Sequence, residues 1–521
     1  MRRSDIGGAG TGNAARLHDA TAERHGDAIA VEAGERFTHR ELRNRSRRVA
    51  GGLLDCGLAP GDALICYLPN CPAYVVGALG ALRAGLALSP VNPQYKAREL
   101  GYQIDDTDAA AVLTHPALRE HAAAALSDRD RDPTVIVAGG GRDGDLAFAD
   151  LDGDPTTVER NDDDVALLPY TSGTTGRPKG VELTHRNLRA QALAHLSNPA
   201  DDLDDEAVRS LVWLPLYHIT GFVHSTWQPL VRGGRVYLRD PESWDPGDAL
   251  ALIEREGITH FVGVTAMYVD MVDADGFGER DLSSLEQASE GGAKMALAVQ
   301  REFEDVAGVA VTEGYGMTET TGATHTQVGS THGPRHGTVG QPLRMVDCRV
   351  VDGDGEVPIG EEGELFVRGP QVMTGYRGRP EATDAAFTDD GYLRTGDVAR
   401  RDGENYYEIV DRKKHVIVTA GYNVYPSEIE ELLGEHEAVA EAAVVGVPDE
   451  RRNEVPEAYV VVRPGVEAGS DVTAEELRQF CLDRVAEYKH PREVEFLDEL
   501  PRTASGKIQK FKLEERDAGE G

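Results

Sequence analysis

The chain has 521 residues, 40% of them hydrophobic, which is enough for two or more globular domains with ordinary cores. Ninety acidic against 54 basic residues give a formal net charge of −36, and such a surface repels nucleic acid and anionic lipid. No stretch reaches 18 uninterrupted apolar residues, and the N-terminus carries no apolar segment, so neither a membrane span nor a signal peptide is expected.

The cysteines indicate a reducing compartment. They form neither a CxxC pair nor a metal-binding spacing, so we expect reduced, buried thiols in a cytoplasmic protein. The five are Cys56, Cys66, Cys71, Cys348 and Cys481.

Lysine is scarce, with nine residues against 45 arginines. Together with the acidic surplus, this composition favours a cytosol of high ionic strength, where a short Debye length screens the self-repulsion of the surface. An acidic mesophilic enzyme from a GC-rich genome is the alternative. Six of the nine lysines lie between residues 412 and 512. An acidic protein must concentrate cations where it binds anionic ligands, so this region is a candidate for such binding.

The N-terminal part predicts alternating helices and strands. Residues 37–57 have an apolar face at helical spacing, 62–70 read as a strand that ends in Pro-Asn, and 73–85 read as the next helix. Residues 127–164 are rich in Asp, Gly and Pro and predict an excursion at the surface.

A run of small and hydroxylated residues, YTSGTTGRPKG at 170–180, predicts a loop that wraps a polyphosphate. Its glycines allow close backbone approach, while its hydroxyls and one lysine can contact phosphate oxygens. Residues 165–170 read as a buried strand and 185–196 as a helix, which is the strand–loop–helix order of many anion sites. It is not a Walker A loop, and an ordinary solvated turn is the alternative. The expected phosphate contacts are Thr171, Ser172, Gly173, Thr174, Thr175, Gly176 and Lys179.

Further along, strands at 211–216, 233–239 and 258–264 continue the alternation and predict largely parallel sheets covered by helices. Residues 337–410 change to short strands and turns, which predicts a small β-rich subdomain. After Asp411 a separate unit of helices and strands begins. We therefore expect domains at 1–411 and 412–521.

Six later segments accompany the loop in a fixed order. They are WLPLYHITGF (213–222), EGGAK (290–294), GYGMTET (314–320), YLRTGD (392–397), DRKKHVIVTAGYNVYPSEIE (411–430) and PRTASGKIQK (501–510). With the loop, this series resembles the adenylate-forming superfamily of acyl- and aryl-CoA synthetases, luciferases and peptide-synthetase adenylation domains. The resemblance extends from about residue 15 to 513.

The resemblance implies an α/β fold. Its large N-terminal domain has two helix-covered, mostly parallel sheets and a small β-rich subdomain. Its small α+β C-terminal domain is mobile about a hinge near 411–415, with Lys414 at the pivot. His415 stands where an acidic residue is common in relatives.

The resemblance also assigns the nucleotide site. The strand end at 290–294 contacts adenine, an aromatic residue stacks on the base, and a threonine touches the α-phosphate. A glutamate ligates Mg²⁺, and an aspartate and an arginine lie at the ribose. In this chain these contacts fall on Gly291, Gly292, Ala293, Tyr315, Gly316, Thr318, Glu319, Asp397 and Arg412. Taken singly, the Gly-Gly and Thr-Gly-Asp segments are ordinary turns.

Two further assignments concern the acid. Lys507 matches the lysine that reaches the substrate carboxylate and the α-phosphate, although a lysine in a Ser-Gly-Lys turn is ordinarily a solvated residue. His218 matches the gate of the carboxylate pocket, and a satisfied buried histidine is the alternative. With Thr318 and Glu319, these two residues complete the expected catalytic set. The expected acyl pocket comprises His218, Phe222, Gly314, Gly322 and Ala323.

The function implied is an ATP-dependent carboxylate–CoA ligase that uses ATP, Mg²⁺ and coenzyme A and acts on medium- or long-chain fatty acids. The alternatives are an aryl- or arylacrylate-CoA ligase and a stand-alone enzyme that loads an acyl carrier protein. A non-enzymatic nucleotide sensor would have no need of Lys507. We expect small-molecule partners, no nucleic acid and no integral membrane association, and we leave a homodimer open.

Overall fold

A computed structural model describes residues 11–127, 133–140, 144–171, 178–196, 208–291, 295–353, 355–419, 422–449, 452–502 and 508–518. The chain divides into two compact units. Unit 1 comprises residues 1–292, 299–347 and 367–393, and unit 2 comprises 293–298, 348–366 and 394–521. Residues 394–411 thus group with the C-terminal part, while the domain boundary at 411 and the hinge stay predictions. Within the described ranges, no helix has the length and apolarity needed to cross a membrane.

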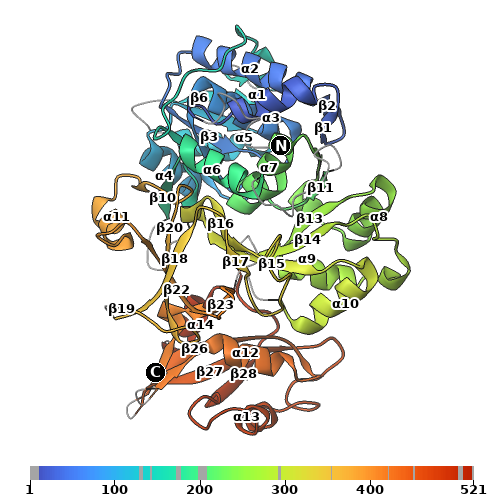
Figure 1. Ribbon diagram of the computed structural model, residues 1–521, viewed down its shortest axis with the longest axis vertical. Coiled ribbons are helices and arrows are strands. Elements are labelled where there is room, and N and C mark those ends of the chain that lie inside the picture. Colours follow the sequence, from blue (N-terminus) through green and yellow to red (C-terminus); the bar gives the residue numbers. More distant parts are fainter. Residues whose placement is uncertain are drawn as a thin grey trace. The chain divides into compact units, whose positions relative to one another are not determined.

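The first sheet of unit 1 is parallel in its centre and antiparallel at both edges. Helices α8 (Pro246–Glu256) and α10 (Leu297–Ala307) lie beside its strands β13 to β15 (Figure 1). In sheet order the strands are β17 (Gln341–Pro342), β16 (Gly322–Thr326), β15 (Val311–Met317), β14 (Gln287–Gly291), β13 (His260–Gly263), β11 (Arg209–Val212), β12 (Arg235–Leu238), β1 (Ile29–Glu32) and β2 (Arg36–Thr38).

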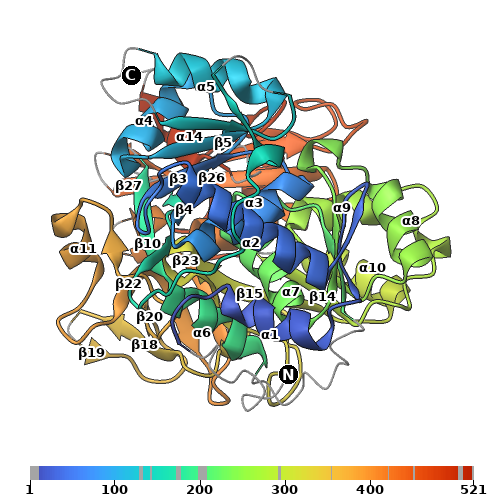
Figure 2. The same ribbon diagram turned by 90° about the horizontal axis from the view of Figure 1, so that it is seen from above.

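The second sheet of unit 1 is also mostly parallel, and helices cover both of its faces. Figure 2 shows α4 (Ala97–Thr107) and α5 (Arg119–Leu126) on one face and α2 (His39–Asp55) and α3 (Pro72–Ala84) on the other. In sheet order the strands are β21 (Gly375–Tyr376), β10 (Lys179–Thr184), β8 (Val165–Leu167), β4 (Ala87–Pro90), β3 (Ala63–Tyr67), β5 (Ala111–Thr114), β6 (Thr134–Val137) and β7 (Leu146–Ala147), with β9 (Tyr170–Thr171) paired to β10. The predicted helix-covered, mostly parallel sheets are confirmed.

Local sequence signals set the helix ends. The Asp245 side chain accepts from the Asp248 N–H at the start of α8, Pro246 occupies its first position, and Gly257 ends it with a φ of +60°. The remaining helices of unit 1 are α1 (Arg16–Arg24), α6 (His185–Leu196), α7 (Gln228–Arg232), α9 (Thr265–Val272) and α11 (Pro380–Ala386). Its short helical turns are η3 (Pro116–Leu118), η4 (Phe148–Asp150), η7 (Pro241–Ser243), η8 (Phe277–Glu279) and η9 (Thr318–Thr320), and η6 (Thr220–Trp227) is a π-helix.

Two local predictions were wrong. The segment 127–164 is not wholly a surface excursion, because its β6 pairs in parallel with the buried β5 and extends the sheet. The phosphate loop does not lead directly into a helix, because β10 intervenes before α6 and pairs antiparallel with β9. The loop therefore closes a β-hairpin, and its anion contacts cannot come from the N-terminus of a helix that follows at once.

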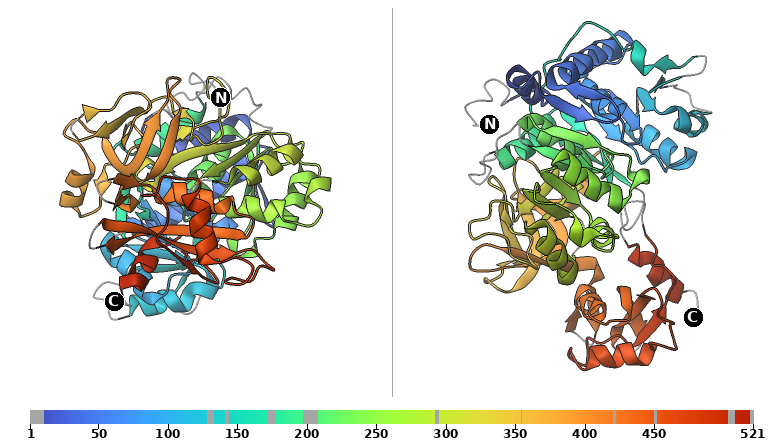
Figure 3. Two further views of the ribbon diagram at one scale, coloured as in Figure 1. Left: turned by 90° about the horizontal axis from the view of Figure 1, so that it is seen from below. Right: turned by 90° about the vertical axis from the view of Figure 1, so that its right-hand side faces the viewer.

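Unit 2 contains two smaller sheets. The first is the predicted β-rich part, in the order β19 (Gly355–Glu356), β18 (Asp347–Asp352), β20 (Glu362–Arg368), β22 (Leu393–Arg401) and β23 (Tyr407–Arg412). The second has the order β25 (Tyr422–Val424), β24 (Ile417–Thr419), β27 (Asn453–Val462) and β26 (Val439–Asp449), and β28 (Glu493–Phe496) pairs with β27. Helices lie against this orange-to-red sheet in Figure 3. They are α12 (Pro426–Gly434), α13 (Ala474–Leu482) and α14 (Lys510–Ala518), and the turn η10 (Lys413–His415) precedes β24.

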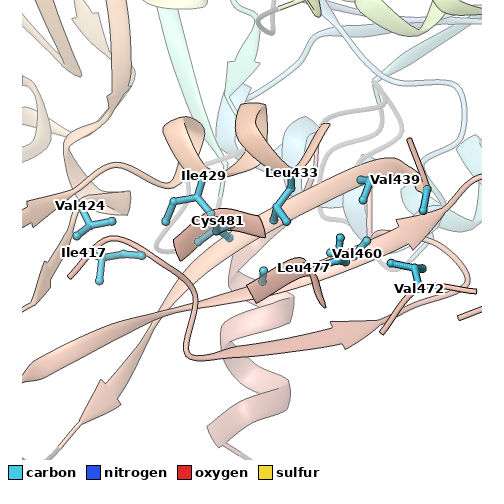
Figure 4. Packing of buried hydrophobic residues seen from close by; sticks show 12 residues of the cluster. Ile417, Val424, Ile429, Leu433, Val439, Val460, Val472, Leu477 and Cys481 are labelled. Atoms are coloured by element: carbon cyan, nitrogen blue, oxygen red, sulfur yellow. The ribbon is translucent and has the colours of Figure 1, made fainter. Parts of the chain in front are cut away.

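The core of the C-terminal sheet comes from its helices and strands together. Ile429 and Leu433 on α12 and Leu477 and Cys481 on α13 are fully buried against Val460 of β27 (Figure 4). Burial of each of these Ile, Leu and Val side chains stabilises the fold by about 1.5–3 kcal/mol. All five cysteines are free thiols; Cys66 and Cys481 are buried as expected, whereas Cys56, Cys71 and Cys348 are only partly so.

Candidate active site

The phosphate loop is held at its two ends by backbone pairing. Thr171 of β9 lies opposite Lys179 of β10, and Tyr170 lies opposite Gly180. The Tyr170 hydroxyl donates to Asp106 Oδ2 at 2.8 Å, which ties the hairpin to α4. The pairing places two of the predicted phosphate contacts side by side. The others, Ser172, Gly173, Thr174, Thr175 and Gly176, lie outside the described residues.

Lys179 and Glu319 both contact one side chain, that of Tyr376. The Lys179 ammonium lies 4.6 Å from the centroid of the Tyr376 ring, and the Tyr376 hydroxyl donates to Glu319 Oε1 at 2.9 Å. Glu319 is buried, with 7% of its surface exposed. Burial, with the Glu319 carboxylate as a further cause, raises the pKa of Tyr376 well above its ordinary value, so the phenol stays protonated and remains the donor.

Backbone hydrogen bonds from the residues on either side of Tyr376 hold these three side chains together. The Met373 N–H donates to Glu319 O at 2.8 Å, and the Arg377 N–H donates to Gly180 O at 2.9 Å. Strand β21 also pairs with β10, with Tyr376 opposite Val181. One short segment therefore bridges the hairpin of the second sheet and the turn η9 of the first.

The turn η9 places Thr318 and Glu319 directly after β15. The Thr320 hydroxyl accepts from the Met317 N–H at 3.0 Å, and Thr321 ends the turn with a φ of +59°. Thr318 is half-buried and Glu319 is buried. The predicted α-phosphate contact and the predicted metal ligand are thus neighbours at one strand end.

The predicted adenine contacts gather at the ends of β14 and β15. Gly291 lies opposite Gly314, and the Tyr315 ring lies 5.8 Å from that of His325. A Cβ at Gly316 would lie 2.0 Å from the Gly322 carbonyl oxygen, so the close approach of β15 and β16 requires glycine there. Gly292 and Ala293 lie outside the described residues.

Of the predicted acyl-pocket residues, Phe222 lies on η6, Gly314 on β15, and Gly322 and Ala323 on β16. The π-helix η6 packs against β16 through His224. Its Nε2 accepts from the Ala323 N–H at 2.9 Å, and its Nδ1 lies 3.3 Å from Gln228 Oε1. Burial lowers the pKa of His224 to about 4, so the ring is neutral and can accept. Gly322 has a φ of +108°, and a Cβ there would lie 2.2 Å from His224 Nε2. π-Helical turns are rare and often occur at functional sites.

His218 lies in the turn before η6, and its backbone oxygen accepts from the Phe222 N–H at 3.0 Å. Burial lowers the pKa of His218 to about 4. Its Nε2 is buried and contacts no hydrogen-bonding group among the described residues. Phe222 is buried, with its ring 6.4 Å from that of Tyr74. An uncharged, partly unsatisfied imidazole beside aromatic rings suits a pocket for an acid with an apolar body.

In unit 2, Asp397 and Arg412 lie opposite each other on β22 and β23. Arg412 Nε lies 2.6 Å from Asp397 Oδ1, and Asp397 is 2% exposed. The predicted pivot Lys414 lines a cavity of 500 Å³ together with Lys510 and the strand residues around Gly446. Lys507 lies outside the described residues.

The carboxylate of Glu319 fits the requirement of Mg²⁺. The ion prefers hard oxygen ligands and is usually held by one or two carboxylates together with substrate phosphates. Glu319 supplies such an oxygen. It accepts a hydrogen bond from Tyr376, the residue whose ring also contacts Lys179 of the phosphate loop. The residues present are therefore compatible with a magnesium–nucleotide complex.

Sequence reasoning assigned no role to Tyr376 or His224. Tyr376 lies 57 residues from Glu319 in the chain, and His224 lies 99 residues from Ala323. Neither pairing has a local sequence signal.

Comparisons with known proteins match both parts of the chain. The model of the AMP-binding enzyme family matches residues 18–377, and that of the AMP-binding enzyme C-terminal domain matches 428–507. A feruloyl-CoA synthase of an Amycolatopsis species is 37% identical over 99% of this chain and 100% of its own. A long-chain-fatty-acid–CoA ligase of Bacillus subtilis strain 168 is 33% identical over 95% and 93%. The structure of ATP-bound MatB from Rhodopseudomonas palustris superimposes with a TM-score of 0.86 at 31% identity, covering 96% and 98%.

Proposed function

The chain belongs to the AMP-binding enzyme family, and we propose that it joins a medium- or long-chain fatty acid to coenzyme A. The coarser activity is that of an AMP-forming acid–thiol ligase of the acyl- and aryl-CoA class, which uses ATP, Mg²⁺ and CoA. The observation that supports the proposal is that Lys179 and Glu319 both contact Tyr376, because a cation suited to phosphate and a carboxylate suited to Mg²⁺ then share one neighbour.

In the proposed reaction an oxygen of the substrate carboxylate attacks the α-phosphorus of ATP. The bond to the bridging oxygen breaks, pyrophosphate leaves and an acyl-AMP forms. The thiolate of CoA then attacks the acyl carbon, and AMP leaves with the bonding electrons. The first step brings two anions together, so positive charge and oriented donors must be in place beforehand.

We assign the residues of this chain as follows. Lys179, Thr171 and the loop between them bind the β- and γ-phosphates, and Thr318 donates to the α-phosphate. Glu319 holds Mg²⁺, which when bound neutralises charge on the phosphate oxygens. Lys507 bridges the acid and the α-phosphate.

The adenosine and acid contacts complete the proposal. Tyr315, Gly291 and Gly316 contact the adenine, and Asp397 and Arg412 contact the ribose. His218, Phe222, Gly314, Gly322 and Ala323 line the acid site. Lys414 is the pivot about which the C-terminal part moves between the two steps.

The acid is proposed from the pocket and the relatives together. Phe222 is apolar and buried, Ala323 is small, and the Bacillus subtilis relative is named for long-chain fatty acids. The alternative is an arylpropenoic acid, because the feruloyl-CoA synthase is 37% identical over its whole length. A phenolic substrate could also satisfy the buried Nε2 of His218.

The test is the release of AMP and pyrophosphate by purified protein across fatty acids of increasing length, benzoates and arylpropenoates. Each assay is run with and without CoA and from low to molar KCl. AMP release that needs CoA and rises with chain length supports the proposal. A preference for arylpropenoates changes the proposed substrate from a fatty acid to an arylpropenoic acid. Pyrophosphate exchange that CoA does not affect points to a carrier protein as acceptor. No acid-dependent release under any salt condition contradicts the ligase activity.

A further inference from the structure

Tyr376 is the point where three segments distant in sequence meet. Its ring lies under the Lys179 ammonium at the end of the phosphate hairpin, and its hydroxyl donates to Glu319 at the end of β15. Its own N–H donates to Thr383 Oγ1 at 2.9 Å, which anchors β21 to α11. The side chain is therefore fixed at its backbone and engaged at both its ring and its hydroxyl.

We propose that Tyr376 is a positioning residue that couples the phosphate-binding lysine to the metal-binding carboxylate. This inference rests on the proposed function of Lys179 and Glu319. The hydroxyl donates to Oε1 of Glu319 and orients the carboxylate that would hold Mg²⁺. The ring holds the Lys179 ammonium on the same side, where both groups can act on one triphosphate.

The hydroxyl is the informative part of the side chain. Phenylalanine would fill the same space and keep the contact with Lys179, but it could not donate to a buried carboxylate. Hydrogen bonds to ionised acceptors are short and strong, and partners of this kind that orient a metal ligand typically change metal affinity by about 10- to 100-fold when they are removed. If the hydroxyl had a purely structural role, the loss of nucleotide affinity in a phenylalanine variant would not depend on the metal.

The ring makes a separate contribution. A cation over an aromatic face within about 6 Å of the centroid is attracted to the ring, and Lys179 lies within that range at 4.6 Å. Losing the ring would free the lysine to move, while losing only the hydroxyl would not. The two parts of the coupling can therefore be tested separately.

The test measures binding of a non-hydrolysable ATP analogue, α,β-methylene-ATP, by calorimetry in EDTA and in Mg²⁺. The ratio of the two dissociation constants reports what the metal contributes. The variants are Tyr376→Phe and Tyr376→Leu. The matched control is Tyr392→Phe, because Tyr392 is a tyrosine that likewise donates to a carboxylate, Asp347 Oδ2 at 2.5 Å, away from these residues. Melting temperatures establish that each variant is folded.

We expect the ratio to fall about tenfold in Tyr376→Phe, with binding in EDTA unchanged, and to stay at the wild-type value in Tyr392→Phe. Tyr376→Leu should lose the same metal effect and also bind the analogue more weakly in EDTA. In turnover, excess Mg²⁺ should restore Tyr376→Phe, and KM for the acid should not change.

Two results would overturn the coupling. An unchanged ratio in Tyr376→Phe removes the role of the hydroxyl, and equal binding of the Phe and Leu variants in EDTA removes the role of the ring. If the wild-type protein binds the analogue no better with Mg²⁺ than without, the proposed function of Glu319 fails first, and the coupling fails with it.

Discussion

Acidification should unfold unit 1 well above the pH at which carboxylates titrate. Histidines buried in its interior resist protonation in the folded state, with burial the largest cause in each case. The pKa falls to about 4 for His39 and to about 3 for His185, His260 and His325, and it falls well below its ordinary value for His18. All five side chains are buried, and His18 Nε2 lies 3.2 Å from His39 Nδ1.

The sign follows from the depressed pKa values. Above pH 6.5 both states hold these rings neutral and the full stability is present. As the pH falls through 6.5, these histidines become protonated in the unfolded chain. In the folded chain they stay neutral until about pH 3–4. Relative to pH 8, each ring therefore lowers the free energy of unfolding by about 1.4 kcal/mol at pH 5.5 and by about 2 kcal/mol at pH 5. His39, His185, His260 and His325 together lower the free energy of unfolding by about 8 kcal/mol at pH 5, within the 5–15 kcal/mol that holds most domains folded.

The assay is urea unfolding of the protein between pH 8 and 5, in about 1 M KCl so that the Debye length of about 3 Å suppresses the change in surface repulsion. His260→Gln removes one buried titrating ring, and the control variant His121→Gln replaces an exposed residue of α5. We expect His260→Gln to lessen the slope of stability against pH by about 1.4 kcal/mol per pH unit, and His121→Gln to leave it unchanged. Equal stability at pH 8 and 5.5, or parallel curves for His260→Gln and wild type, would refute the reasoning.

Three further outcomes are expected. Gly322→Ala should destabilise unit 1 by about 3 kcal/mol in urea unfolding, because its Cβ would strike His224 at a φ of +108°, whereas an alanine at Gly333 meets nothing within 4 Å and costs only backbone strain. Asp397→Asn should weaken ATP binding about tenfold in calorimetry and bind 2′-deoxy-ATP as well as ATP; a variant that still prefers ATP would contradict the ribose role. Lys507→Ala should abolish acid-dependent pyrophosphate exchange yet still form thioester from supplied acyl-AMP, and equal loss of both steps would exclude a role confined to adenylation.

Much of the fold was predictable because its signals are local. The apolar spacing and the flanking Pro and Gly mark α3, whose predicted range 73–85 differs little from Pro72–Ala84. The run 185–196 coincides with α6. Strand–helix alternation predicted the parallel sheets, because parallel strands need a crossover between them. The two wrong predictions, at 127–164 and after the phosphate loop, both concern short strands, β6 and β10, whose pairing with β5 and β9 the residue pattern did not indicate.

The sequence by itself determined the family, the order of the motifs and the residue types of the chemistry, since these are properties of short contiguous segments. Only the tertiary structure decided which side chains meet. Tyr376 joins Lys179 to Glu319, and His224 holds Ala323, across separations of up to 197 residues along the chain. Such contacts depend on strand pairing and packing direction, which a linear pattern does not encode. The acid that the enzyme selects depends on the same packing, and for that reason the motifs identify the reaction more sharply than its substrate.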